Sequence, residues 1–114
     1  AFHSPLMENV RENFIEAIDK ISIRDAEIPV YANVSASPVF RADDIRNCMV
    51  QQLTSSVRWT ETIEALVSEG RKRGVEIELY EIGHGKVLAG LVKRITEAVT
   101  VRSISEATDI EEVV

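Results

Sequence analysis

Apolar residues recur at helical spacing from position 5 to about position 21. Ser4 stands where a helix N-cap is expected, and Pro5 occupies the first turn, where a missing backbone N–H has no cost. The pattern therefore predicts one amphipathic helix over residues 5–21. Its predicted inner positions are Met7, Val10, Phe14, Ala17, Ile18 and Ile21.

Short runs of β-branched and aromatic residues predict the strands. Residues 28–34 form such a run between turn-forming residues and are expected to be a buried strand, which the Ser- and Pro-containing segment 35–38 ends. Residues 75–82 alternate in part between apolar and polar positions, and residues 101–104 are expected to form a last short strand.

Helical periodicity continues between these strands. It predicts helices over residues 43–53, 59–72 and 87–99, and Gly70 and Gly74 are expected to loosen and to end the second of them. Alternation of helices and strands predicts the α/β class, with a short parallel sheet flanked by helices. Two or three strands make a thin sheet, so we expect the chain to be a piece of a larger domain.

Composition narrows the possible partners. The net charge of −6 disfavours a nucleic-acid partner, which would need a basic face. No apolar run approaches the roughly 20 residues that span a bilayer, so no membrane partner is expected. The single cysteine and the lack of a basic and apolar leader favour a reducing, cytoplasmic location.

Few residues in the chain have the spacing of a catalytic or binding motif. His3, just before the predicted helix, is either an ordinary polar residue or one half of a catalytic pair, but the nucleophile motif G-x-S-x-G is absent. The segment 83–86, Gly-His-Gly-Lys, lacks the spacing of a phosphate-binding loop and is interpreted as a plain turn. Cys48 lies on an apolar helix face, where a buried structural role is expected. Two separate histidines and one cysteine predict no metal site.

Four segments in order carry a resemblance to a known family. The segments "AFHSPLM", "PVYANVSASP", "QQLTSSVRW" and "YEIGHGKVLAGLVKRI" together resemble the C-terminal part of malonyl-CoA:acyl-carrier-protein transacylases, from position 1 to about position 104. The resemblance implies the C-terminal portion of an α/β-hydrolase-like acyltransferase domain. Residues 1–114 would then be a partial domain that lacks the upstream nucleophile-bearing part and the ferredoxin-like subdomain.

The same resemblance implies a reaction and a site. Such enzymes transfer malonyl from malonyl-CoA through an acyl-serine to the phosphopantetheine arm of acyl carrier protein, without a bound cofactor. In this picture His3 is the catalytic base, the main-chain carbonyl of Gln52 orients its ring, and Asn33 supports the pocket. The partners implied are acyl carrier protein, the coenzyme A thioester and the remainder of the parent acyltransferase chain.

The sequence departs from the family pattern at one position, and two other functions are compatible with it. The family usually has Gly-Pro-Gly-Lys where this chain has His84 in the second position, and His84 has no implied role. The chain could instead be a non-catalytic α/β module that binds a partner through an open apolar face. It could also be a fragment of a polyketide-synthase acyltransferase domain, which shares the chemistry.

Overall fold

A computed structural model describes residues 2–111 of the chain. The chain divides into two compact units, Ala1–Thr62 and Ile63–Val114. Within the described residues, no helix has the length and apolar character needed to cross a membrane.

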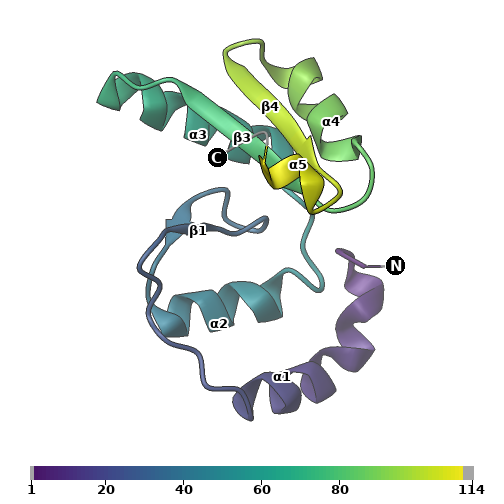
Figure 1. Cartoon of the computed structure of the whole chain (residues 1–114). Helices are drawn as coiled ribbons and strands as arrows, with labels where there is room; N and C mark the ends of the chain where they lie inside the picture. Colours follow the sequence, from purple (N-terminus) through teal and green to yellow (C-terminus); the bar gives the residue numbers. More distant parts are fainter. Residues whose placement is uncertain (1, 112–114) are drawn as a thin grey trace. The chain divides into compact units, whose positions relative to one another are not determined.

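The first unit begins with two successive helical segments (Figure 1). A 3-10 helix, η1, covers Pro5–Val10, and the α-helix α1 covers Arg11–Asp19. The prediction of one continuous helix over residues 5–21 is therefore wrong in its details. Val10, with φ −106° and ψ −1°, departs from α-helical geometry and marks the junction. Ile18 is buried as predicted, whereas Ile21 lies beyond the helix end and is 53% exposed.

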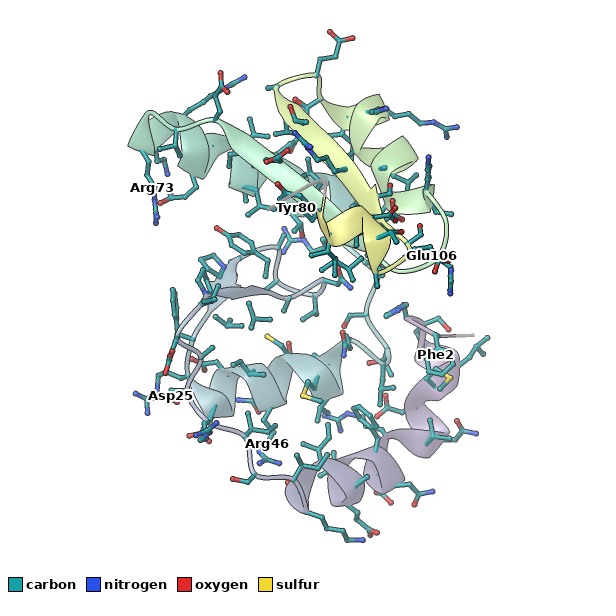
Figure 2. The ribbon with its side chains drawn as sticks, in the orientation of Figure 1. Phe2, Asp25, Arg46, Arg73, Tyr80 and Glu106 are labelled. Carbon is teal, nitrogen blue, oxygen red and sulfur yellow. The ribbon has the colours of Figure 1, made fainter. Side chains whose placement is uncertain are left out.

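Helix α2 covers Ala42–Gln51 and contacts α1. Its first turn contains Asp43 and Asp44, whose charges suit the positive end of the helix dipole. The carboxylate of Asp25, labelled in Figure 2, accepts a hydrogen bond from the N–H of Ala42 at 2.8 Å and so satisfies one free donor of this helix start. The predicted helix over residues 43–53 is confirmed within two residues at each end.

A small hairpin replaces the predicted buried strand. Strand β1, Val30–Tyr31, pairs antiparallel with β2, Pro38–Val39, and the residues between them form turns. The expectation of a buried strand over residues 28–34 is wrong, because Ile28 is 79% exposed and only two residues pair. Pro38 begins a strand instead of preventing one, which is possible because the first residue of an edge strand needs no N–H for pairing.

The second unit carries the parallel sheet. Helix α3, Trp59–Arg73, leads to β3, Ile77–Ile82, and then α4, Val87–Ile95, connects to β4, Val99–Ile104. Strands β3 and β4 pair in parallel, from Ile77 opposite Val99 to Ile82 opposite Ile104 (Figure 1). The predicted α/β class with a short parallel sheet is confirmed. Val99, predicted on the fourth helix, instead begins β4, because α4 ends at Ile95 and Thr96 is extended.

Both helices pack on one face of this sheet. A Cβ on Gly70 of α3 would lie 2.5 Å from Cγ1 of Ile77, so the helix and β3 approach too closely for any side chain there. Glu81, four residues after Ile77 and on the same face of β3, contacts the start of α4. Gly70 therefore permits close packing and does not loosen α3, whereas Gly74, with φ +66°, follows the helix end as predicted.

The acidic segment after β4 begins with an ordered turn. Asp109, in the short helix α5, Thr108–Glu111, accepts hydrogen bonds from the N–H groups of Ser105 and Glu106 at 2.7 and 2.9 Å. These bonds lower the pKa of the Asp109 carboxyl below its ordinary value, because they favour its charged form. Residues 112–114, which follow this helix, lie outside the described residues.

Candidate functional site

His3 lies in a turn directly before η1. Ser4 is the N-cap of η1, and its hydroxyl accepts a hydrogen bond from the N–H of Leu6 at 3.4 Å. His3 itself has φ +62°, in the left-handed region that costs a residue with a side chain about 1–2 kcal/mol. His3 is half-buried in this turn. A strained backbone persists only where surrounding contacts hold it.

The contact that holds the ring comes from the end of α2. Nδ1 of His3 lies 2.7 Å from the main-chain oxygen of Gln52, which is the C-cap residue of α2. Carbonyl groups in the last turn of a helix have no partner within the helix and are free to accept such a bond. Because a carbonyl oxygen only accepts, Nδ1 is the protonated nitrogen, and the lone pair of the neutral ring is on Nε2. The structure thus brings together two of the three predicted site residues.

Asn33 lies in the turn after β1 and does not share that hydrogen bond. Its carbonyl accepts from the N–H of Arg58 at 2.9 Å, and the Nη1 atom of Arg58 donates to the carbonyl of Ser35 at 3.2 Å. Arg58 therefore fixes this turn through two carbonyl groups. Its guanidinium also forms two hydrogen bonds to Glu61, which raise the pKa of Arg58 and lower that of Glu61.

Asn33 and Gln52 line one cavity of about 160 Å³ in the first unit. The other lining residues are mostly apolar and come from β1, β2 and α2. They are Val30, Tyr31, Ala32, Val39, Ile45, Cys48 and Met49. Cys48 is half-buried against this cavity, in the apolar surroundings that its helix face predicted.

The glycine-containing turn between β3 and α4 does not have the features of an anion-binding site. Gly83 and Gly85 have φ values of +132° and +98°, which residues with side chains rarely adopt. The carboxylate of Glu81 accepts from the N–H groups of Leu88 and Ala89 at 2.9 and 3.0 Å. These backbone bonds are the main reason why the pKa of Glu81 is lowered. Since the chain's own carboxylate occupies this helix start, the interpretation of the segment as a plain turn is favoured over a phosphate site.

Within the described residues, metal-ligating side chains do not cluster at the cavity lined by Asn33 and Gln52 or at the turn between β3 and α4. Across residues 2–111, no three or more His, Cys, Asp or Glu side chains lie close enough together to hold a metal ion. Sequence reasoning missed Arg46 and Arg58, which bind carbonyl groups far away in the chain. Arg58 belongs to the quoted segment "QQLTSSVRW" and could have been singled out there, whereas no local pattern distinguishes Arg46 from the other charged residues of its helix.

No protein-family model matches the chain. Solved structures show the fold: that of an acyl-carrier-protein S-malonyltransferase from Bartonella henselae matches with a TM-score of 0.86 and 37% identity, over 98% of this chain and 34% of that one. A malonyl-transacylase solved in complex with a type II polyketide acyl-carrier protein matches with a TM-score of 0.82 and 32% identity, over 96% of this chain and 34% of that chain. The chain therefore has the fold of one part of an acyltransferase domain.

The sequence comparison is more specific. The malonyl CoA-acyl carrier protein transacylase of Bacillus subtilis is 39% identical over 110 residues, which are 96% of this chain and 33% of the relative. A transacylase of the same name from Synechocystis is 34% identical over 96% of this chain and 36% of its own length. The chain is homologous to the C-terminal part of malonyl CoA-acyl carrier protein transacylases, and the predicted resemblance is confirmed. It spans about a third of the length of the relatives it matches.

Proposed function

We propose that this chain supplies the general base of a malonyl transfer from malonyl-CoA to acyl carrier protein. The observation that carries the proposal is the 2.7 Å contact between Nδ1 of His3 and the main-chain oxygen of Gln52. It leaves Nε2 as the basic nitrogen, and an imidazole commonly exchanges a proton near neutral pH. The homology to malonyl transacylases over nearly the whole chain supports the choice of substrate.

The proposed reaction has two balanced halves. Nε2 of His3 takes the proton of a serine hydroxyl while the serine oxygen forms a bond to the malonyl carbonyl carbon. The carbon–sulfur bond then breaks, and the imidazolium returns the proton to the departing coenzyme A thiolate. In the second half the phosphopantetheine thiol loses its proton to Nε2, its sulfur takes the malonyl group, and the serine oxygen regains a proton.

The proposal assigns the nucleophile to another part of the protein. No G-x-S-x-G segment occurs in residues 1–114, so we infer that this chain is a partial acyltransferase domain and that the serine lies outside it. Asn33 has a supporting role in this proposal, because it lines the same cavity as Gln52 and its carbonyl is held by the N–H of Arg58. The substrates would be malonyl-CoA and the carrier's phosphopantetheine arm, with no bound cofactor.

Acyl carrier protein is the proposed macromolecular partner. One structurally similar malonyl-transacylase was solved with a polyketide acyl-carrier protein, which also keeps the polyketide-type acyltransferase open as a variant of the same chemistry. No specific observation favours the alternative hypothesis that the chain is a non-catalytic module that binds a partner. A cytoplasmic location remains part of the proposal, because the single cysteine favours a reducing compartment.

Trapping the acyl-enzyme tests this assignment. The complete enzyme that contains this chain would be mixed with malonyl-CoA, quenched in acid and digested, and the malonylated peptide identified by mass spectrometry. We expect the malonyl group on a serine outside residues 1–114. Stable malonylation of a serine within these residues, or no acyl-enzyme at all in an enzyme that transfers malonyl, would contradict the proposal.

A further inference from the structure

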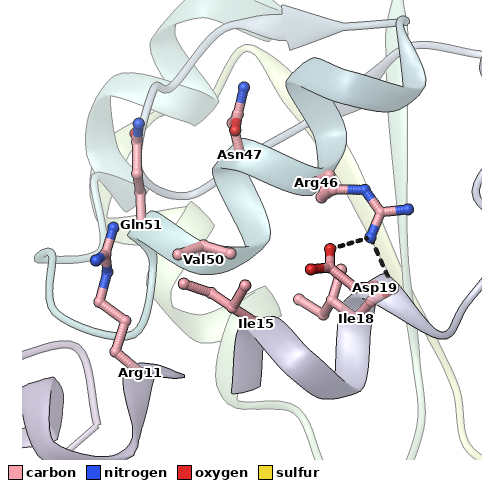
Figure 3. Close-up of a pocket in the computed structure, with 8 residues that line it drawn as sticks. All are labelled: Arg11, Ile15, Ile18, Asp19, Arg46, Asn47, Val50 and Gln51. Atoms are coloured by element: carbon pink, nitrogen blue, oxygen red, sulfur yellow. Dashed lines mark hydrogen bonds and ion pairs between the residues drawn. The ribbon is translucent and has the colours of Figure 1, made fainter. Parts of the chain in front are cut away.

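The guanidinium of Arg46 joins α2 to the end of α1. Its Nη1 atom donates to the carbonyl of Ile18 at 2.7 Å and to Oδ1 of Asp19 at 3.2 Å, and its Nη2 atom donates to the carbonyl of Ile21 at 3.1 Å (Figure 3 shows the first two contacts). Carbonyl groups in the last turn of a helix carry partial negative charge, so a planar cation with several donors suits them. The Ile18 carbonyl accepts from Arg46 in addition to the N–H of Ile21 at 2.9 Å. The Arg46 side chain is only 29% exposed, although it is charged.

Few apolar side chains line the space between α1 and α2 next to the Arg46 contact. A groove of about 300 Å³ runs between the two helices (Figure 3), and its apolar lining residues are Ile15, Ile18 and Val50. Of these three, only Ile18 is buried. Close packing normally fixes how one helix lies on another, and a groove of this size removes part of that restraint. The polar contacts of Arg46 therefore add a restraint on how α1 lies on α2.

The same two helical segments meet again at their other end. His3 precedes η1 and α1, and it contacts Gln52 at the C-terminal end of α2. Arg46 and Gln52 are six positions apart, which corresponds to about 9 Å along a helix. Contacts at both ends of a helix pair restrict sliding as well as rotation, whereas one contact alone acts as a pivot.

We infer that Arg46 is a positioning residue for His3: by fixing the end of α1 on α2, it holds the imidazole at the Gln52 carbonyl. The inference rests on the proposed role of His3 as the base. A shift of α1 by about 1 Å would lengthen a 2.7 Å hydrogen bond beyond its useful range. The ring would then lose the donor–acceptor pairing that keeps the proton on Nδ1 and the lone pair on Nε2.

Nitrogen-15 NMR of the histidine rings tests this directly in the complete enzyme. Ring-nitrogen shifts distinguish a protonated from an unprotonated nitrogen, and the His3 signals are assigned by their loss in His3→Gln. We expect the wild-type His3 ring to be fixed as the Nδ1–H tautomer. In Arg46→Gln we expect a mixture of tautomers and a fall in kcat of about tenfold, with KM changed less than about twofold.

Two further variants separate positioning from general damage to the fold. Arg46→Lys keeps the charge but not the planar set of donors, so we expect an intermediate tautomer ratio and a partial loss of kcat. Arg11→Gln is the matched control, since Arg11 lines the same groove and, among the described residues, its side chain forms an exposed ion pair with Glu8 at 3.9 Å. It should leave both the tautomer and kcat as in the wild type. If Arg46→Gln does not fold, Arg46→Lys still decides the question.

The outcomes distinguish this inference from the function on which it rests. A fixed Nδ1–H tautomer and wild-type kcat in folded Arg46→Lys and Arg46→Gln would overturn the positioning role, even if His3→Gln is inactive. Full malonyl transfer by His3→Gln would instead refute the assignment of His3 as the base. A tautomer change of equal size in Arg11→Gln would also count against a specific role for Arg46.

Discussion

Replacing His3 by asparagine separates the chemistry of the ring from its structural role. The Nδ2 atom of an asparagine can donate to the Gln52 carbonyl much as Nδ1 of His3 does at 2.7 Å. Asparagine also adopts positive φ values more readily than most residues, which matters at φ +62°. What His3→Asn lacks is a basic nitrogen in the position of Nε2, so the variant removes the proposed base and keeps its support.

The structure sets the expected sizes of the two effects. Loss of the general base should lower the rate of serine acylation by about 10²–10⁴-fold, which is about 3 to 5 kcal/mol of transition-state stabilisation. The free energy of unfolding should change by less than about 0.5 kcal/mol in His3→Asn, because the hydrogen bond is replaced. His3→Ala should lose the same activity and in addition about 1 kcal/mol of stability, since the Gln52 carbonyl loses its partner.

Single-turnover transfer from malonyl-CoA, followed in the complete enzyme by quenched flow, measures the acylation rate, and urea unfolding measures stability. His84→Asn is the matched control, because the other histidine of the chain lies on an exposed turn and should change neither quantity. Retention of more than about a tenth of the acylation rate in His3→Asn would refute the reasoning from the ring geometry, because a general base contributes at least about 10²-fold.

Three further substitutions probe the site and its scaffold. Gln52→Ala should lower malonyl transfer by less than about threefold in a steady-state assay, because His3 contacts the main chain and not the side chain; a loss of about 10²-fold would show a role for the amide. Glu81→Gln should lower stability at pH 7 and flatten its acid dependence. Because the folded-state pKa of Glu81 is lowered, its contribution is present above the ordinary value of 4.5 and is lost as the pH falls below it, so urea midpoints of wild type and variant should converge in acid. An unchanged difference between them at pH 3 and pH 7 would contradict this sign. Gly70→Ala should destabilise the chain by about 1 kcal/mol in urea unfolding, because the clash with Ile77 exceeds the gain in helix propensity; a stabilised variant would mean that the strand yields.

Local sequence pattern predicted the elements whose own periodicity is strong. Apolar spacing predicts helices close to 42–51 and 59–73 and strands close to 77–82 and 101–104, but it assigns Val99, the first residue of the last strand, to the preceding helix. The same reasoning failed at Pro38, which was interpreted as the end of a strand, because its pairing with Tyr31 depends on how the turn folds back. It also failed at Val10, where a change of helix type leaves the apolar spacing nearly intact.

Of the candidate site, the sequence predicted some residues and missed others, because long-range contacts leave no local pattern. His3, Gln52 and Asn33 came from the family resemblance, since no short motif connects residues 49 positions apart in the chain. Arg46 was missed because its three hydrogen-bond acceptors lie at and just beyond the end of another helix, and only one of them, the Asp19 carboxylate, belongs to a side chain. Contacts to main-chain carbonyls leave no residue type in the sequence that could indicate them.

The strand-borne carboxylate of Glu81 also leaves the exposed tip of the neighbouring loop, at His84, open to substitution. Since the start of α4 is held from β3, the side chain of His84 is not needed to fix that helix, whereas Gly83 and Gly85 keep φ values that favour glycine. A fluorophore on a cysteine introduced at His84, or a short inserted peptide tag, should therefore be tolerated, which offers a place to attach a reporter without touching the helix that follows.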